Sequence, residues 1–305
     1  MSSAASPAHF ATGRQRLLGH LAMVAFATFV AGSFTVGARI VPELDPGPLN
    51  AIRFLIAAVL MGIFTFAIMG HRLEIPERPW RFGLYGVLNG AYFVTMFIAL
   101  TMTAPVATSA VFTLTPLLTA VFGLVLLGQR TRPVVMVSIV IAALGALWVI
   151  FEADLEAISR FALGPGEAIF LVGCAAYALI APLMRKFNRN EPGVVLTFWM
   201  LVGTTACIAL YGARGIVTTD WTGLPAEVWW GIAYLATLPS AVSVFLLQYA
   251  SVRLPASKVM AYGYLLPGIV IVLEGLTGNG WASLPVVAGA GVTVGALVLL
   301  AVLAD

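Results

Sequence analysis

Only 10% of the 305 residues are charged and 61% are hydrophobic, whereas an ordinary soluble domain is about 25% charged. A chain with so few charges cannot build a surface for water, so we expect its solvent to be a lipid bilayer. The net charge of +3 is modest, and we predict no nucleic-acid partner.

The apolar runs are about 20 residues long and do not alternate, which is typical of membrane-spanning helices and not of barrel strands. In lipid, every backbone polar group must be bonded within the structure, and helices achieve this locally. We therefore predict an all-α membrane protein with ten transmembrane helices. In chain order the predicted spans are Leu17–Ala38, Pro48–Met69, Phe82–Thr101, Pro105–Leu127, Pro133–Phe151, Glu167–Met184, Gly193–Ala213, Ala226–Tyr249, Ala256–Gly275 and Leu284–Leu303.

Basic residues indicate the orientation of these spans, because cytoplasmic loops carry an excess of Lys and Arg. With a cytoplasmic N-terminus, Arg39, Arg160 and Arg214 fall outside, and Arg53 falls within a span. The other twelve of the sixteen basic residues fall inside. This alternation predicts that both termini are cytoplasmic. Those twelve residues are Arg14, Arg16, Arg72, Arg78, Arg81, Arg130, Arg132, Arg185, Lys186, Arg189, Arg253 and Lys258.

The second half of the chain repeats sequence features of the first about 150 residues later. Asp45-Pro46-Gly47 is echoed by Glu191-Pro192-Gly193, Pro116 by Pro267, and Gly145 by Gly295. Five spans per half is an odd number, so the two halves are predicted to be inverted repeats, a build common among secondary transporters. The predicted divisions are a cytoplasmic tail (1–16), a first five-helix repeat (17–151), a periplasmic linker (152–166) and a second five-helix repeat (167–305).

Several of these stretches resemble a known family. The stretch Ala99-Leu100-Thr101-Met102-Thr103-Ala104, then Pro116, Leu127-Gly128-Gln129-Arg130-Thr131 and Gly145, is similar to the end of an EamA domain. Asn50-Ala51-Ile52-Arg53-Phe54 resembles another part of that domain. The resemblance implies a member of the drug/metabolite transporter superfamily, most similar to bacterial inner-membrane exporters of aromatic amino acids. The chain departs from the family pattern at Gln129, where Glu is frequent, and at Trp199, which stands opposite Arg53 in the repeat.

Polar and aromatic residues deep within spans are candidates for a substrate cavity, because polar groups are costly in lipid. Asn89 is the strongest candidate, since a buried carboxamide must find partners. Serine and threonine hydroxyls also bond their own helix backbone, so each has a plain structural explanation as well. Aromatic rings at the midplane suit a flat apolar substrate, but they are also ordinary packing residues. The predicted substrate-binding residues are Ser33, Asn89, Tyr92, Phe93, Ser109, Phe112, Tyr177, Ser240, Ser243 and Tyr262.

Two prolines, Pro116 and Pro267, lie at equivalent places within spans of the two repeats. Proline removes a backbone hydrogen bond and can kink or break a helix. We interpret the pair as hinges, with static kinks as the alternative. Arg53 lies about 9 Å into its span, and we expect its side chain to extend outward or to pair with Asp45 or Glu43.

Motifs for cofactor or metal chemistry are missing from the sequence. There is no GxxxxGK[ST] motif for ATP and no HExxH motif for zinc, and we predict no cofactor, no metal site and no enzymatic activity. Cys174 and Cys207 lie singly in apolar runs and are interpreted as packing residues.

The sequence therefore predicts a bacterial inner-membrane transporter that functions as a monomer, with the lipid bilayer and a small-molecule substrate as its partners. We expect it to export, or facilitate the movement of, aromatic or amphipathic amino acids by alternating access through a central cavity. The alternatives are a broad-specificity exporter of drugs, nucleobases or metabolites and, more remotely, an integral membrane enzyme.

Overall fold

The computed structural model describes residues 12–160 and 162–303, and within these ranges all regular structure is helical. Most of the predicted cytoplasmic tail, residues 1–11, lies outside the described residues. The first half contains α1 (Gly13–Ile40), α2 (Pro46–Gly62) with its π-helical extension η1 (Ile63–Ile68), α3 (Trp80–Leu100), α4 (Pro105–Phe112), α5 (Thr115–Leu127), α6 (Pro133–Ile150) and the short α7 (Leu155–Ser159). The second half contains α8 (Pro165–Lys186), α9 (Gly193–Tyr211), α10 (Ala213–Thr218), α11 (Ala226–Ala236), the π-helix η2 (Thr237–Val242), α12 (Ser243–Ser251), α13 (Ala256–Ala261), the 3-10 helix η3 (Tyr262–Leu265), α14 (Leu266–Leu276) and α15 (Leu284–Leu303).

The length and composition of these helices confirm the predicted class, an all-α membrane protein of about ten spans. Nine helical stretches in the described residues are long and apolar enough to cross a bilayer, and Leu284–Leu300 is a shorter apolar tenth. Large hydrophobic side chains are exposed along them, including Leu55, Val125, Val172 and Leu210. So many exposed apolar side chains are incompatible with water and suit contact with lipid tails.

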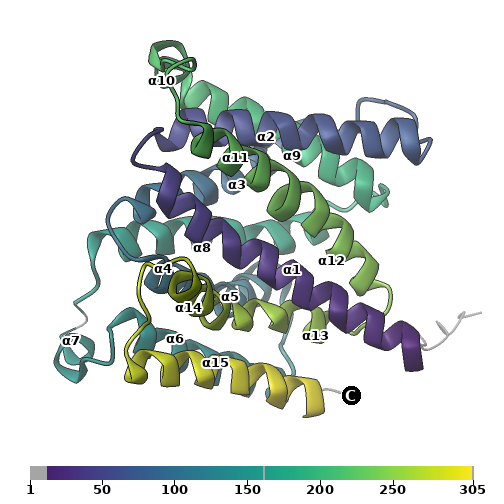
Figure 1. The fold of residues 1–305 in the computed structure, drawn as a ribbon. Helices are drawn as coiled ribbons and strands as arrows, with labels where there is room; N and C mark the ends of the chain where they lie inside the picture. The colour runs from purple at the N-terminus through teal and green to yellow at the C-terminus, as the bar shows by residue number, and fades with distance from the viewer. Residues whose placement is uncertain (1–11, 161, 304–305) are drawn as a thin grey trace, which may run out of the picture.

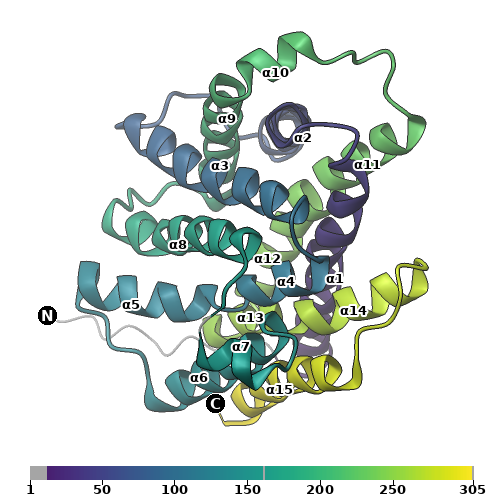
Figure 2. The same ribbon diagram turned by 90° about the vertical axis from the view of Figure 1, so that its left-hand side faces the viewer.

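The chain enters its first helix and leaves its last helix on the same side of the molecule (Figure 1). The beginning of α1 and the end of α15 are near one another in that view, while α7 and α10 lie on the opposite side. Figure 2, seen from that opposite side, shows α10 at the top of the bundle and α7 in the lower part, next to α6 and α15. Neither short helix was predicted. α7 begins where the side chain of Asp154 accepts hydrogen bonds from the amides of Glu156 and Ala157, which caps its first turn.

Helix packing in one half has a counterpart in the other. α3 packs against α8 and α9, and the corresponding segment from α11 to α12 packs against α1 and α2. α2 packs against α9, the helix that corresponds to it in the second half, and α6 packs against its corresponding helix, α15. This arrangement surrounds a central region with α1, α3, α8 and the α11–α12 segment, where the candidate site lies.

Two spans are broken at equivalent places. Pro116 is the second residue of α5, which follows the break at Thr113–Leu114 after α4. Pro267 is likewise the second residue of α14, which follows η3. Proline is favoured in the first turn of a helix because its missing amide would have no partner there. Each proline thus starts a new helical segment, and the breaks lie beside the two prolines that the sequence analysis interpreted as hinges.

Candidate substrate site

A cavity of about 130 Å³ lies where the two halves of the chain meet. Its wall is built from helices of both halves, so no single repeat forms it alone. It is smaller than the roughly 300–1,000 Å³ typical of sites for drug-sized ligands, so this conformation has room for a small metabolite. The lining residues are Phe26, Val30, Ser33, Arg53, Phe54, Asn89, Tyr92, Phe93, Phe112, Tyr177, Met200, Leu201, Pro239, Ser240, Ser243, Val244 and Leu247.

The structure brings together eight of the ten predicted substrate-binding residues in this lining: Ser33, Asn89, Tyr92, Phe93, Phe112, Tyr177, Ser240 and Ser243. Ser109 and Tyr262 lie outside it. Ser109 is fully buried, and its hydroxyl donates to the carbonyl of Val106 within α4. Tyr262 is at the start of η3, and its hydroxyl is 2.7 Å from Nδ1 of His20.

Aromatic rings form one wall of the cavity, with Tyr92 of α3 at its centre. The ring centroid of Tyr92 is 4.7 Å from that of Tyr177 and 4.7 Å from that of Phe93. Phe112 is 5.8 Å from Tyr92 and 6.2 Å from Tyr177. These distances lie in the range of favourable ring–ring contacts, so the wall offers a flat or cyclic substrate several rings at once.

Asn89 lies one helical turn before Tyr92 on α3 and is 3% exposed. Its Nδ2 donates to the hydroxyl of Thr204 on α9 at 3.1 Å, and that hydroxyl donates to the carbonyl of Met200. The amide oxygen of Asn89 accepts no hydrogen bond from the described part of the chain. Asn89 therefore joins α3 to α9 through its Nδ2, while its amide oxygen has no hydrogen-bond partner within the described chain.

Two cavity serines bond to their own helices. The hydroxyl of Ser33 donates to the carbonyl of Val30, and that of Ser243 donates to the carbonyl of Pro239. Each hydroxyl proton is therefore already used, as is common in membrane helices. Their oxygens retain lone pairs, so in the cavity these serines act as hydrogen-bond acceptors.

Arg53 is the lining residue that the sequence analysis placed wrongly. Its side chain is fully buried, and no ion pair joins it to Asp45 or Glu43 in the described structure. Its Nε donates to Oγ of Ser240 at 3.2 Å. Its guanidinium carbon lies 4.5 Å from the ring centroid of Phe93 and 5.1 Å from that of Phe54. The position of Arg53 about two turns into its span suggested a side chain that reaches the membrane surface. In the structure, residues of α3 and η2 cover the Arg53 side chain.

The sequence around Pro239 explains how Ser240 comes to face Arg53. In an α-helix, the carbonyl of Leu235 would accept from the amide of residue 239, but proline has no amide hydrogen. The hydroxyl of Ser240 donates to this carbonyl at 2.8 Å, within the π-helix η2. Its oxygen then accepts from Arg53. A proline followed by serine in the middle of a span was the sequence signal for this polar position.

A second, larger cavity of about 340 Å³ lies toward the ends of α5 and α8. Pro116 and Pro182 line it, together with Gln129 and Arg185. The Arg185 Nη1 donates to Oε1 of Gln129 at 2.6 Å, which links the ends of α5 and α8. Pro267 lines neither cavity.

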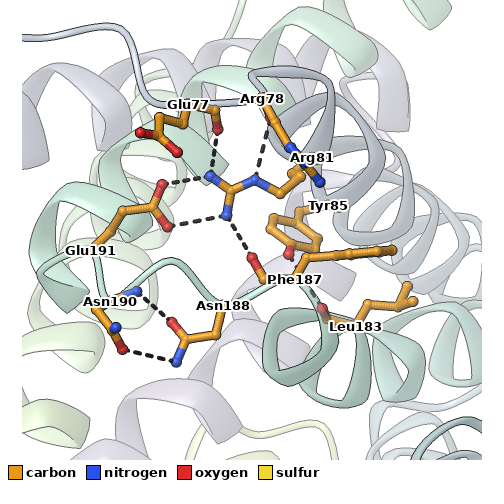
Figure 3. A network of polar contacts seen from close by, with 9 residues as sticks. All are labelled: Glu77, Arg78, Arg81, Tyr85, Leu183, Phe187, Asn188, Asn190 and Glu191. Carbon is orange, nitrogen blue, oxygen red and sulfur yellow. Dashed lines mark hydrogen bonds and ion pairs between the residues drawn. The ribbon is translucent and has the colours of Figure 1, made fainter.

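An ion pair of the buried Arg81 with the partly exposed Glu191 joins the two halves at the start of α3 (Figure 3). Arg81 makes a two-pronged contact with the carboxylate of Glu191, at 2.6 Å and 3.1 Å. Its remaining N–H groups donate to the backbone carbonyls of Glu77, Arg78 and Phe187. All five donors of this guanidinium are therefore used, which fixes the start of α3 to the connection between α8 and α9.

This fold and cavity define a class of protein: a multi-pass helical membrane protein with a largely apolar cavity that holds a few polar groups between two halves, as in small-molecule transporters. A model of the EamA-like transporter family matches residues 17–151 and 164–302. The chain belongs to this family and is a membrane transporter of the drug/metabolite superfamily.

Two further similarities agree with this assignment. The chain is 24% identical over 265 residues to the "Uncharacterized transporter YyaM" of Bacillus subtilis (strain 168), covering 85% of this chain and 86% of that protein. A solved structure, described as the crystal structure of a protein, matches with a TM-score of 0.66 and 21% identity, covering 96% of this chain and 99% of the other. The structural match supports the fold alone.

Proposed function

We propose that this transporter moves amino acids, aromatic or amphipathic ones, out of a bacterial cell across the inner membrane. The protein acts as a monomer with both termini in the cytoplasm. Its two five-helix repeats alternate between states that open the central cavity to either side of the membrane. Each half of the chain provides part of the binding site.

The observation that carries this proposal is the composition of the cavity. Aromatic rings line one part of it, while Arg53, Asn89 and serine oxygens supply polar groups in the same small space. An amphipathic amino acid matches this division, because its side chain is apolar and its backbone groups are charged. The aromatic contacts each contribute about 0.5–1.5 kcal/mol beyond the burial of area.

The volume of the cavity bears on which amino acid is bound. A space of about 130 Å³ holds a small amino acid, whereas a tryptophan side chain requires the wall to open. We therefore include threonine, phenylalanine and tryptophan as test substrates. Their relative rates separate a site that expands from one that keeps this size.

The direct test is uptake of each labelled amino acid into liposomes that contain the purified chain. We expect flux above that of empty liposomes for at least one of the three, and competition by the unlabelled amino acid. No flux for any amino acid contradicts the proposed substrate class.

The alternative, a broad exporter of drugs, nucleobases or metabolites, is tested in the same liposomes. A nucleobase and a cationic aromatic drug are added as competitors. A buried guanidinium repels cations, so we expect the cationic drug to compete weakly. Strong competition by both compounds favours the alternative.

A further inference from the structure

The protein buries two arginines whose surroundings differ sharply. Arg81 uses all five N–H donors, two of them on the carboxylate of Glu191. Arg53 is also fully buried, yet in the described structure it donates a single hydrogen bond, to the neutral hydroxyl of Ser240. Its Nη1 is buried without a hydrogen-bond partner. The protein thus satisfies every hydrogen-bond donor of the Arg81 guanidinium and leaves donors of the Arg53 guanidinium unsatisfied.

An incomplete buried guanidinium is costly, because arginine keeps its charge and loses its hydration. No described Asp or Glu forms an ion pair with Arg53, and none lines the cavity. Charged residues at such depth in a membrane protein mark substrate or ion pathways. The missing partner of Arg53 is therefore an anion that comes from outside the chain.

The aromatic neighbours of Arg53 restrict how that anion binds. Phe93, Phe54 and Phe97 have ring centroids 4.5, 5.1 and 5.7 Å from the guanidinium carbon. Rings stabilise a cation through contact with its charge but accept no strong hydrogen bond. Nε is used by Ser240, so the Nη groups of the guanidinium remain for a planar acceptor, and a carboxylate accepts two such N–H groups at once.

We propose that Arg53 binds the carboxylate of the transported substrate, and that the carboxylate, not an amine, decides which molecules enter the cavity. This inference rests on the proposed function, because it takes the cavity as the transport site. It extends that function from amino acids to small organic carboxylates that lack an amino group. No carboxylate lines the cavity for the ammonium of an amino acid, which meets neutral oxygens such as the Asn89 amide oxygen and the hydroxyls of Ser33 and Ser243.

The first test uses the unmodified protein and needs no variant. Binding of a matched series is measured with the purified protein in detergent, by calorimetry and by the rise in melting temperature that a bound ligand causes. The series is phenylalanine, 3-phenylpropionate, phenethylamine, phenylalaninamide and phenyl phosphate. We expect phenylalanine and 3-phenylpropionate to bind, and phenethylamine and phenylalaninamide to bind at least tenfold more weakly. Equal binding of phenethylamine and 3-phenylpropionate overturns the proposal.

Phenyl phosphate distinguishes two anions that an arginine recognises. Binding of phenyl phosphate without 3-phenylpropionate overturns the carboxylate assignment. Binding of 3-phenylpropionate with little binding of phenyl phosphate supports it.

The second test changes the charge. Arg53→Gln should weaken binding of 3-phenylpropionate by about 10- to 100-fold. Arg53→Lys keeps the charge without the planar pair of donors, and we expect an intermediate loss. Arg160→Gln is the control, because Arg160 is exposed directly after α7 and pairs with Glu156 of that helix. If Arg53→Gln folds and binds 3-phenylpropionate as tightly as Arg160→Gln does, the proposal fails.

The two proposals fail in different ways. Amino acid flux that continues unchanged in Arg53→Gln refutes the role of Arg53 and leaves the proposed transport intact. Arg53-dependent binding of 3-phenylpropionate without flux of any amino acid refutes amino acid transport and supports the carboxylate site.

Discussion

Asn89 contributes both to the packing between helices and to the lining of the cavity. It bonds to Thr204 and also lines the cavity, while Thr204 does not. Asn89→Ala removes both roles, and Thr204→Val removes only the bond between α3 and α9. The two variants together separate binding from packing.

We expect Asn89→Ala to lower the ratio kcat/KM of transport by about tenfold, the equivalent of one lost hydrogen bond of about 1–1.5 kcal/mol. Thr204→Val should lower the melting temperature and leave kcat/KM nearly unchanged. Both are measured by liposome uptake and by thermal unfolding of the same preparations. If Thr204→Val lowers kcat/KM as much as Asn89→Ala does, Asn89 acts through helix packing and not through substrate binding.

At the scale of single residues, the sequence was informative for most of the cavity lining and less so for Arg53 and Tyr262. Asn89 and Tyr92 are three residues apart, so they share a helix face. Their depth within the span and their polar groups made both candidates for the cavity lining, where both lie. Arg53 was misplaced because its surroundings depend on α3 and η2, which are distant in sequence. Tyr262 was misplaced because its span breaks at that residue.

Among the helices, the two broken spans are the elements most suited to movement. Pro116 and Pro267 begin α5 and α14 after breaks in the regular hydrogen-bond pattern. Alanine in either place restores the backbone donor and favours a continuous helix by up to about 3 kcal/mol. If the breaks act as hinges, restoring the helix opposes the change between states.

Pro116→Ala and Pro267→Ala should therefore each slow maximal transport several-fold, with KM changed little. The measurement is the initial rate of uptake at a series of substrate concentrations. Pro182→Ala, within α8, serves as a control for a proline in a continuous helix. Normal rates in both hinge variants indicate static breaks.

Over the whole molecule, the halves are held together by close backbone contact between α3 and α9. A Cβ added to Gly86 would lie 2.3 Å from the carbonyl carbon of Gly203, and one added to Gly203 would lie 2.2 Å from the carbonyl oxygen of Phe82. Small residues allow this approach, which is the usual basis of helix packing in membranes. The ion pair between Arg81 and Glu191 lies at the end of the same interface.

Gly86→Ala should destabilise the protein by about 1–3 kcal/mol, because the backbones must separate. Gly83→Ala is the matched control on the same helix, since its added Cβ would meet nothing within 4 Å. The measurement is thermal unfolding in detergent. Equal melting temperatures for the two variants contradict the close packing.

The overall architecture was accessible from sequence because hydropathy, length and charge act over whole spans. Those three properties predicted about ten spans, which the structure bears out. The short helices α7 and α10 were not predicted, because each depends on a few local hydrogen bonds, whereas the breaks near Thr113 and Tyr262 lie beside the prolines interpreted as hinges. The close approach of Gly86 to Gly203 depends on pairing between helices, which no single span specifies.

The solitary charge of Arg53 has an energetic consequence for transport. If the cavity carries a carboxylate and the guanidinium stays with the protein, each turnover moves one net negative charge across the membrane. A potential of 100 mV, negative inside, contributes about 2.3 kcal/mol to the outward movement of that charge. This equals a concentration ratio of roughly fifty. An amino acid zwitterion carries no net charge, so the membrane potential contributes no free energy to its movement. The potential alone therefore drives the export of a carboxylate that lacks an amino group and leaves an amino acid at equal concentrations on the two sides.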